Sequence, residues 1–338
     1  MQQSPTLQEC PLEKSECVLF YDSALKALPA FEDWQKDFLY HIELTGGESL
    51  KSFEQFKSTL EELGKGDLSV SLKKLKFVAV GGGSVGDFVG FIASIYKRGV
   101  ELIQIPSTWL SAIDSAHGGK TALNFFSAKN QIGTFYPATQ IFLVDEILQS
   151  QPEDLAQQSV SEIYKIMFID GTICSVENCL QKPEKFSVFI DRYLMKSIEA
   201  KYKIVLQDPF EKTGLRQVLN LGHTLGHILE SHFGLSHGEA VARGLIFALK
   251  WSHDRYKNPK LLEYAHRFED IFSTLSGKKL DPVSESEFVK IATKDKKWTA
   301  AKALNFVFVK DYGDCTIEEV SLDEFISEGL RQGIVKSE

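Results

Sequence analysis

The segment 78–87, with the sequence VAVGGGSVGD, constrains the fold of this chain more than any other. It starts with apolar residues typical of a buried strand, continues through three glycines and ends in residues with helical spacing. Glycine lets a backbone approach a phosphate closely, and the N-terminus of a helix attracts negative charge. We therefore predict a dinucleotide-binding turn. A simple tight turn is the alternative, because the glycines do not follow the G-x-G-x-x-G spacing.

Short apolar runs alternate with helical patterns through the first 150 residues. Turn or charged residues bound each run, as they do for strands that are buried on both faces. This alternation predicts a parallel sheet of the nucleotide-binding kind. The expected strands are 17–22, 75–80, 101–105 and 140–145, and the expected helices are 51–63 and 87–98.

The second half of the chain has a different pattern. From 153 to about 275, apolar residues recur every three or four positions, which predicts helices. The late run 303–310, ALNFVFVK, alternates like a strand. The polar residues QSQP at 149–152 mark a break, so we predict two domains, 1–150 and 151–338.

Composition limits the class of protein and its partners. The chain is 43% hydrophobic and 25% charged, which is typical of globular proteins and excludes a disordered or collagen-like chain. A net charge of −8 argues against a nucleic-acid partner. The polar first sixteen residues do not resemble a signal peptide, and the apolar stretch 77–96 contains an aspartate and five glycines. Five scattered cysteines form no disulfide or zinc-ribbon pattern. We expect a soluble, cytoplasmic protein without a membrane partner.

Three segments place glycine close to Arg or Lys: YKRG at 96–99, AIDSAHGGK at 112–120 and AKNQIG at 128–133. Their repetition predicts backbone turns that present cations to one ligand, and solvated loop charges are the alternative. Asp22, at the end of the first expected strand, is placed to accept a hydrogen bond from a ribose hydroxyl. A turn-forming aspartate is the alternative for this position.

Histidines cluster between residues 223 and 237. Four of the eight in the chain lie there: His223, His227, His232 and His237. The first two are four residues apart and share a helix face. Two imidazoles, one carboxylate and an open position form the ligand set of a catalytic zinc site. The spacing does not choose among the four histidines.

The carboxylate of such a site has a candidate in SEIYK at 161–165. Glu162 and Lys165 are three residues apart on one helix face with apolar neighbours, and buried charges of this kind need partners or a ligand. A surface ion pair is the alternative for these two residues.

These segments together resemble the 3-dehydroquinate synthase family of the sugar-phosphate cyclases. Similarity runs from residue 81 to residue 244 almost without interruption, and weaker matches lie at 47–51 and 294–297. The matching segments are GGGSVGD (81–87), YKRG (96–99), DSAHGGKTALN (114–124), AKNQIGTFY (128–136), SEIYK (161–165), GLRQVLNLGHTLGH (214–227) and HGEAVARG (237–244).

The resemblance implies an α/β, Rossmann-like NAD-binding domain, an all-helical metal-binding domain after it, an active site between them, and a homodimer. It implies Zn²⁺ or Co²⁺ held by Glu162, His223 and His237. His227 is then a contact for the substrate phosphate.

The remaining site residues follow from the same resemblance. Positions that contact substrate are Arg98, Asp114, Lys120, Asn130, Lys165, Lys201, Arg216, Asn220, His227 and Lys296, with Lys203 as the alternative to Lys201. Positions that contact NAD are Asp22, Glu48, Lys51, Gly83, Ser84, Val85, Gly86, Asp87, Ser107, Thr108, Lys120 and Lys129. His117 stands where the family has a small or apolar residue, and we expect it to pack.

The activity implied is conversion of the sugar phosphate 3-deoxy-D-arabino-heptulosonate 7-phosphate to 3-dehydroquinate and phosphate, a step of the shikimate pathway. The family reaction combines transient oxidation by NAD, phosphate β-elimination, reduction, ring opening and aldol cyclisation. Another cyclase, acting on sedoheptulose 7-phosphate or glucose 6-phosphate, is one alternative. A metal-dependent polyol or glycerol dehydrogenase is another, although Glu162 with Lys165 fits the cyclases better. A catalytically inactive relative is the third.

Overall fold

The computed structural model describes residues 1–65, 75–126, 128–273, 280–293 and 303–337. The chain divides into two compact units, Met1–Leu155 and Ala156–Glu338. The division falls five residues after the boundary expected at residue 150. In the described residues, no helix combines the length and the apolar character needed to cross a membrane.

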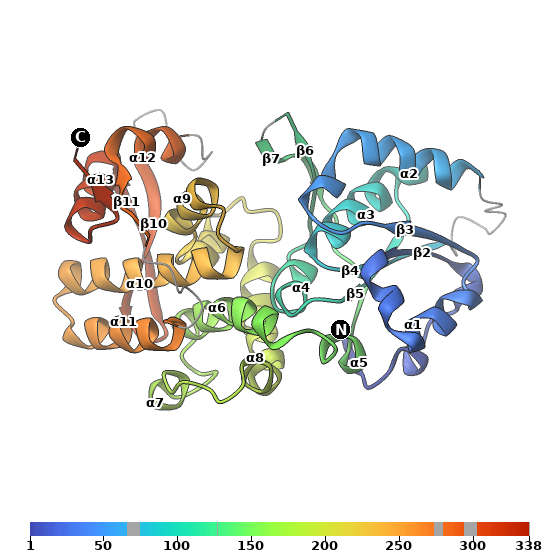
Figure 1. Cartoon of the computed structure of the whole chain (residues 1–338), viewed down its shortest axis with the longest axis horizontal. Helices are drawn as coiled ribbons and strands as arrows, with labels where there is room; N and C mark the ends of the chain where they lie inside the picture. Colours follow the sequence, from blue (N-terminus) through green and yellow to red (C-terminus); the bar gives the residue numbers. More distant parts are fainter. Residues whose placement is uncertain (66–74, 127, 274–279, 294–302, 338) are drawn as a thin grey trace. The chain divides into compact units, whose positions relative to one another are not determined.

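A six-stranded parallel sheet forms the centre of the first unit (Figure 1). Its strands lie in the order β1-β8-β5-β4-β2-β3. All four expected strands are confirmed, and their apolar side chains are buried on both faces of the sheet. Two edge strands, β1 and β3, were not predicted. The strands are β1 (Gln2–Ser4), β2 (Cys17–Asp22), β3 (Tyr40–Leu44), β4 (Lys76–Gly81), β5 (Glu101–Pro106) and β8 (Gln140–Val144).

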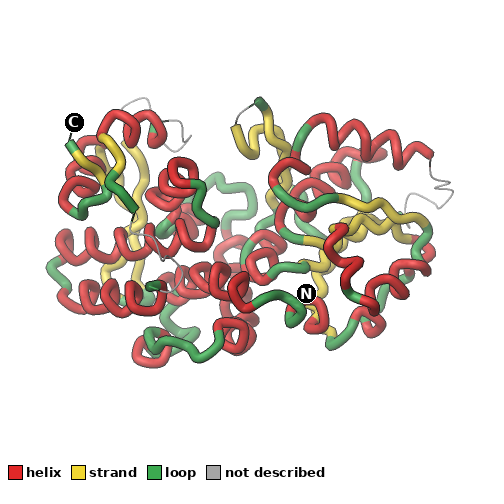
Figure 2. Tube along the Cα trace, viewed as in Figure 1, coloured by secondary structure: helices red, strands yellow, loops and turns green. Residues whose placement is uncertain are grey.

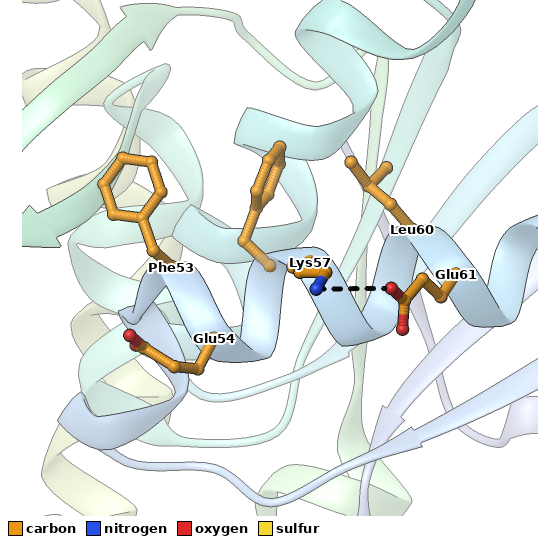
Figure 3. Close-up of a pocket in the computed structure, with 6 residues that line it drawn as sticks. Phe53, Glu54, Lys57, Leu60 and Glu61 are labelled. Atoms are coloured by element: carbon orange, nitrogen blue, oxygen red, sulfur yellow. Dashed lines mark ion pairs between the residues drawn. The ribbon is translucent and has the colours of Figure 1, made fainter.

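Helices connect the strands of this sheet. They are α1 (Pro29–Trp34), α2 (Phe53–Lys65), α3 (Gly83–Ile95), α4 (Trp109–Ile113) and α5 (Asp145–Leu148). α3 follows β4 almost directly and buries Val85, Phe88 and Ile92 against the sheet. α2 is amphipathic, and an ion pair between Lys57 and Glu61 (3.7 Å) lies along its exposed side (Figure 3).

A hairpin lies apart from the main sheet in the first unit (Figure 1). Its antiparallel strands are β6 (Lys120–Phe125) and β7 (Ala128–Phe135). A strand replaces the turn expected at 128–133, because Ala128, Ile132 and Gly133 pair with β6, although Asn130 between them has φ +54° at an irregularity of the pairing. The other two segments do form turns, with Arg98 at φ +72° and Gly119 at φ +65°.

The second unit is mainly helical (Figure 2). Its helices are α6 (Glu153–Ile169), which begins at the boundary, α7 (Val176–Cys179), α8 (Phe186–Gln207), α9 (His223–Phe233), α10 (His237–Tyr256), α11 (Pro259–Phe272), α12 (Glu285–Ala292) and α13 (Leu322–Arg331). The described part of this unit also contains four strands: β9 (Val283–Ser284), β10 (Ala303–Asp311), β11 (Asp314–Ser321) and β12 (Val335–Lys336).

The strands of the second unit refine the expectation of an all-helical domain. β10 confirms the strand expected at 303–310, and it pairs with β11 as an antiparallel hairpin that was not predicted. Apolar residues of β10 pack on α10, where Trp251 contacts Phe306 (ring centroids 4.6 Å apart) and Phe308 (5.0 Å). The hairpin therefore covers the apolar side of α10.

Candidate functional site

The three residues expected to hold a metal ion lie close together in the second unit. Glu162, in α6, is fully buried, while His223 and His237 are the first residues of α9 and α10. The Nε2 atoms of the two histidines each lie 3.4 Å from Oε1 of Glu162. One ligand atom from each residue lies within 4.8 Å of the other two. Among the described residues, no other three His, Cys, Asp or Glu side chains are arranged in this way.

The structure chooses among the four histidines of the cluster. The ring of His227 lies 5.5 Å from that of His223 and 6.3 Å from that of His237, centroid to centroid, but it does not join the group. His232 packs against Phe233. The expected contact of His227 with a substrate phosphate stays a prediction.

A short corner places His237 beside α9. Gly234 ends α9 in the left-handed conformation, with φ +65°, which is favourable only for glycine and a few polar residues. The hydroxyl of Ser236 then caps α10 by accepting a hydrogen bond from the backbone N–H of Glu239 (3.4 Å). The chain reverses within three residues, so the start of α10 returns to the helix that carries His223.

Glycines bring the backbones of α9 and α10 into contact. A Cβ atom on Gly244 would lie 1.8 Å from the carbonyl oxygen of Gly222, and one on Gly226 would lie 3.1 Å from that of Ala240. Gly222 has φ +78° and directly precedes His223. Small residues at these positions therefore set the spacing between the two helices that carry the imidazoles.

Glu162 stays ionised because of its neighbours. Lys165, one turn further along α6, is 2% exposed and forms an ion pair with Glu162. Burial alone would raise the pKa of Glu162, but Lys165 and His223 outweigh burial and hold the pKa well below its usual value. The burial of both side chains excludes the surface ion pair that was the alternative for these residues.

The two imidazoles differ in their charge. Burial and the Lys165 cation lower the pKa of His223 to about 4, which keeps this ring neutral. Burial acts in the same direction on His237, but the carboxylates of Glu162 and Glu230 outweigh it and raise the pKa to about 10. Without an ion, the cluster therefore combines a neutral ring, a protonated ring and a buried carboxylate, and an ion bound at Nε2 of His237 would displace a proton from that ring.

This donor set fits a divalent transition-metal ion. Both oxygens of Glu162 are buried, and neither makes a hydrogen bond of regular geometry, although Lys165 and both histidines place a nitrogen at ion-pair distance. Two imidazole nitrogens and one carboxylate form a known catalytic zinc set, and imidazole and carboxylate ligands also suit neighbouring divalent metals. An ion here would contact the carboxylate and both Nε2 atoms.

Two other expected substrate residues of the second unit, Lys201 and Arg216, are also buried, whereas Asn220 is partly exposed. Lys201 lies in α8 with 4% of its surface exposed, and Arg216 and Asn220 lie in the 3₁₀ turn Leu215–Asn220. Nη1 of Arg216 donates to the backbone oxygen of Pro209 (3.1 Å). The guanidinium is therefore fixed before any ligand binds. Lys296 lies outside the described residues.

Asp208 anchors the loop that leads to Arg216. Its carboxylate accepts hydrogen bonds from the backbone N–H groups of Lys212 (2.7 Å), Thr213 (3.2 Å) and Arg216 (3.4 Å). Burial would raise the pKa of Asp208, but the backbone donors of Thr213 and Lys212 outweigh burial and lower it.

The glycine loop of the first unit begins α3. Gly82 is the N-cap residue, and Gly83 to Asp87 form the first turns of the helix. A Cβ on Gly81 would lie 2.5 Å from Cβ of Val85, and a Cβ on Gly86 would lie 3.2 Å from Oε1 of Gln104. Packing within the unit therefore accounts for the need for glycine at these two positions. The helix N-terminus remains a favourable place for an anion.

Lys51 contacts one residue that is expected to bind NAD and one that is expected to bind substrate. This lysine is 3% exposed, donates to Oδ2 of Asp87 (2.7 Å) and contacts Oδ1 of Asn130. Asn124, which the sequence analysis missed, donates to Oε1 of Glu48 (2.9 Å) and accepts from the N–H of Asn130 (2.9 Å). Its place in the matching segment 114–124 is the signal that pointed to it.

Several predicted residues have local structural roles. Asp22 accepts from the backbone N–H of Ala24 (3.1 Å), as a turn-forming aspartate does, and its contact with a ribose stays a prediction. The hydroxyl of Thr108 caps α4 by accepting from the N–H of Ser111 (3.1 Å). His117 is buried and its Nε2 lies 2.8 Å from the oxygen of Ala112, which confirms that it packs.

The remaining predicted residues lie in the first unit at turns and strand ends. Arg98 ends the 3₁₀ turn that precedes β5, Asp114 lies between α4 and the next 3₁₀ turn, and Ser107 follows β5. Lys120 begins β6 and Lys129 lies in β7. Their ligand contacts stay predictions.

Two surface hollows of about 560 Å³ lie away from these residues. One runs along α2 and is lined by Phe53, Glu54, Phe56, Lys57, Leu60 and Glu61 (Figure 3). The other, in the second unit, includes Lys203, the alternative to Lys201, among its lining residues. No predicted site residue other than Lys203 lines either hollow.

Comparisons with known proteins identify the family. The sequence profile of the 3-dehydroquinate synthase N-terminal domain matches residues 41–158, and that of the C-terminal domain matches residues 159–298. A 3-dehydroquinate synthase from Francisella tularensis is 34% identical over 289 residues, which cover 83% of this chain and 79% of that protein. The chain belongs to the 3-dehydroquinate synthase family. It is therefore an enzyme.

Further relatives support the same family and fold. A 3-dehydroquinate synthase from Staphylococcus haemolyticus is 34% identical over 249 residues, or 70% of this chain and 69% of that protein. Among solved structures, 2-deoxy-scyllo-inosose synthase in complex with carbaglucose-6-phosphate, NAD⁺ and Co²⁺ has a TM-score of 0.79 at 24% identity, covering 96% of this chain and 94% of that chain. A 2-epi-5-epi-valiolone synthase from Streptomyces hygroscopicus with NAD⁺ and Zn²⁺ has a TM-score of 0.77 at 21% identity, covering 98% and 95%. These structures share the fold of this chain.

Proposed function

We propose that this chain is an NAD- and metal-dependent lyase that converts 3-deoxy-D-arabino-heptulosonate 7-phosphate to 3-dehydroquinate and phosphate. The buried cluster of Glu162, His223 and His237 carries this proposal, together with membership of the 3-dehydroquinate synthase family. When bound, NAD⁺ would accept and return a hydride and a Zn²⁺ or Co²⁺ ion would polarise substrate oxygens.

Residues of the second unit would hold the ion and fix the charge around it. Glu162, His223 and His237 supply the donor atoms, and Lys165 keeps Glu162 ionised. Lys165 also provides a buried cation beside the place where negative charge develops on the substrate. The burial of Glu162 and Lys165 excludes bulk water, which strengthens these interactions.

Cationic residues would hold the two anionic ends of the substrate. Arg216 presents a fixed guanidinium, and arginine binds a carboxylate with two parallel hydrogen bonds, so we assign the substrate carboxylate to Arg216 and Asn220 with Lys120. We assign the phosphate to Arg98 and His227. Their task is orientation, because correct placement of a reacting group removes much of the barrier.

Residues of the first unit would hold the dinucleotide. The N-terminus of α3 offers backbone N–H groups and a positive dipole end to the pyrophosphate. Lys51, fixed between Asp87 and Asn130, stiffens the segments on either side of this helix. We assign the NAD contacts to this region, including Glu48, Ser107 and Thr108.

A product assay tests the proposed function. Purified protein would be incubated with Zn²⁺, NAD⁺ and the heptulosonate phosphate while phosphate, dehydroquinate and NADH are followed together. We expect equal amounts of phosphate and dehydroquinate, no lasting NADH, and loss of turnover with a chelator or in Glu162→Ala. Lys57→Ala, on the exposed side of α2, is the control that should retain full activity.

Other outcomes would contradict this substrate. Turnover of sedoheptulose 7-phosphate or glucose 6-phosphate in its place would assign a sister cyclase. Lasting NADH would indicate a polyol dehydrogenase, and no reaction with any of these substrates would indicate an inactive relative. The homodimer and the cytoplasmic location stay predictions, and light scattering during gel filtration tests the first of them.

A further inference from the structure

Each histidine of the metal cluster has an acceptor at its Nδ1 atom. Nδ1 of His223 lies 3.2 Å from the backbone oxygen of Leu221, and Nδ1 of His237 lies 3.1 Å from Oε2 of Glu230. The Nε2 atom of each ring faces Glu162. A neutral imidazole carries one N–H, and an acceptor at Nδ1 places the proton there and leaves the lone pair on Nε2.

The two rings are held by different means. His223 is 8% exposed, and its Nδ1 acceptor is a backbone atom two residues earlier in the chain. The side chain of His237 is 31% exposed and begins α10 after a three-residue corner. Packing therefore restrains His237 less than His223, and its orientation depends more on the hydrogen bond at Nδ1.

Glu230 is well placed to supply that hydrogen bond. It lies on α9 seven residues after His223, and therefore on the same face of this helix. Its side chain is 21% exposed, so the carboxylate is partly withdrawn from water. A hydrogen bond to a carboxylate is stronger than one to a neutral carbonyl.

We propose that Glu230 is a positioning residue of the metal centre. It holds His237 in the orientation and tautomer in which Nε2 faces the ion, and it acts through His237 without touching metal or substrate. This inference rests on the metal site of the proposed function but assigns a residue that neither the sequence motifs nor the comparisons single out.

Cobalt binding tests the inference without turnover. Co²⁺ alone would be titrated into metal-free wild type, Glu230→Ala, Glu230→Gln and the control Glu263→Ala, following the visible d–d absorption and the competition with a chelator. Glu263 is a matched control because it is also a helical carboxylate of this unit, paired with Arg267 four residues on (2.7 Å). Loss of a carboxylate that orients a metal-bound histidine typically weakens metal binding by about 10–100-fold.

We expect Glu230→Ala to lose affinity in that range and to change the cobalt spectrum. Glu230→Gln should recover most of the affinity, because its amide oxygen still accepts a hydrogen bond from Nδ1 of His237. If Glu230 acted only through its charge in the fold, this recovery would not occur. Glu263→Ala should match wild type. Equal Co²⁺ affinity and equal spectra for wild type and Glu230→Ala would overturn the inference.

A second readout applies if Glu230→Ala does not fold. Nitrogen NMR of ¹⁵N-histidine protein loaded with Zn²⁺ should show His237 protonated at Nδ1, and protonation at Nε2 would overturn the inference. Failure of the proposed function is distinguishable from these results. Cobalt binding that depends on Glu230, without dehydroquinate formation, would contradict the proposed reaction alone.

Discussion

The substitution Gly244→Ala tests whether close contact between α9 and α10 sets the geometry of the metal cluster. The added Cβ would lie 1.8 Å from the oxygen of Gly222 and 2.7 Å from its carbonyl carbon. Both atoms belong to the backbone, so no side-chain rotation relieves the contact. Carbon–oxygen contacts are rarely shorter than 3.0 Å, so the helices must separate by about 1.2 Å.

Two effects of this separation have different magnitudes. Inserting a methyl group into a well-packed site destabilises the fold by about 1–3 kcal/mol. The second effect falls on His223, which directly follows Gly222. Metal sites require ligand positions within about 0.5 Å, so a shift of about 1 Å should weaken metal binding at least tenfold.

The assay combines unfolding in urea, followed by circular dichroism, with chelator competition for Zn²⁺. Gly64→Ala is the control, because a Cβ there meets no atom within 4 Å and alanine favours helix, so stability should rise by up to about 1 kcal/mol with unchanged metal affinity. Wild-type stability and metal affinity in Gly244→Ala would refute the reasoning about this contact.

Three other predictions follow from buried groups. Burial raises the pKa of Cys17 to about 11 and of Cys179 to about 12, so both thiols stay protonated and unreactive at pH 8. Mass spectrometry should find both cysteines unmodified after iodoacetamide treatment of the native protein at pH 8, and modified after unfolding. The folded-state pKa of Asp208 is lowered, so the stability that its carboxylate contributes is present above about pH 4 and is lost as pH falls through the folded pKa. Urea unfolding should therefore show Asp208→Asn less stable than wild type at pH 7, with a smaller difference at pH 3. Lys51→Met leaves the partly buried carboxylate of Asp87 without its cation and should cost about 1–3 kcal/mol in urea unfolding, whereas an unchanged midpoint would show that the pair contributes nothing.

Local pattern predicted the central strands but not the edges of the sheet. Residues 17–22 form a strand with the expected bounds because the first five of them are buried, on both faces of the sheet. β3 escaped prediction because His41 and Glu43 are exposed on an edge strand, which weakens the apolar signal. β7 is largely exposed and polar, so its one lysine and its glycine resembled a turn.

The start of α3 shows a limit of interpreting glycines as loop residues. The sequence placed the helix from residue 87, whereas it begins at Gly83. The glycines belong to the helix because Val85 packs against Gly81 and Gln104 packs against Gly86. Such contacts depend on neighbouring strands and are not visible in local spacing.

Residue types predicted the chemistry of the metal cluster, whereas its membership followed from the family resemblance and not from spacing. Residue types alone indicated two imidazoles and a carboxylate. Spacing grouped His223 with His227, since both lie on one helix face, whereas the structure pairs His223 with His237 through the corner between α9 and α10. Glu230 was missed because its partner lies on the other helix; its position three residues after His227 was the available signal.

Metal content of purified variants tests the central claim most directly, that Glu162, His223 and His237 hold one ion. After Zn²⁺ loading and dialysis, elemental analysis should find about one zinc per chain in wild type, His227→Ala and His232→Ala. Glu162→Gln, His223→Ala and His237→Ala should each retain almost none while keeping the wild-type circular dichroism spectrum. A full complement of zinc in any of these last three folded variants, or its loss in His227→Ala, would contradict the assignment.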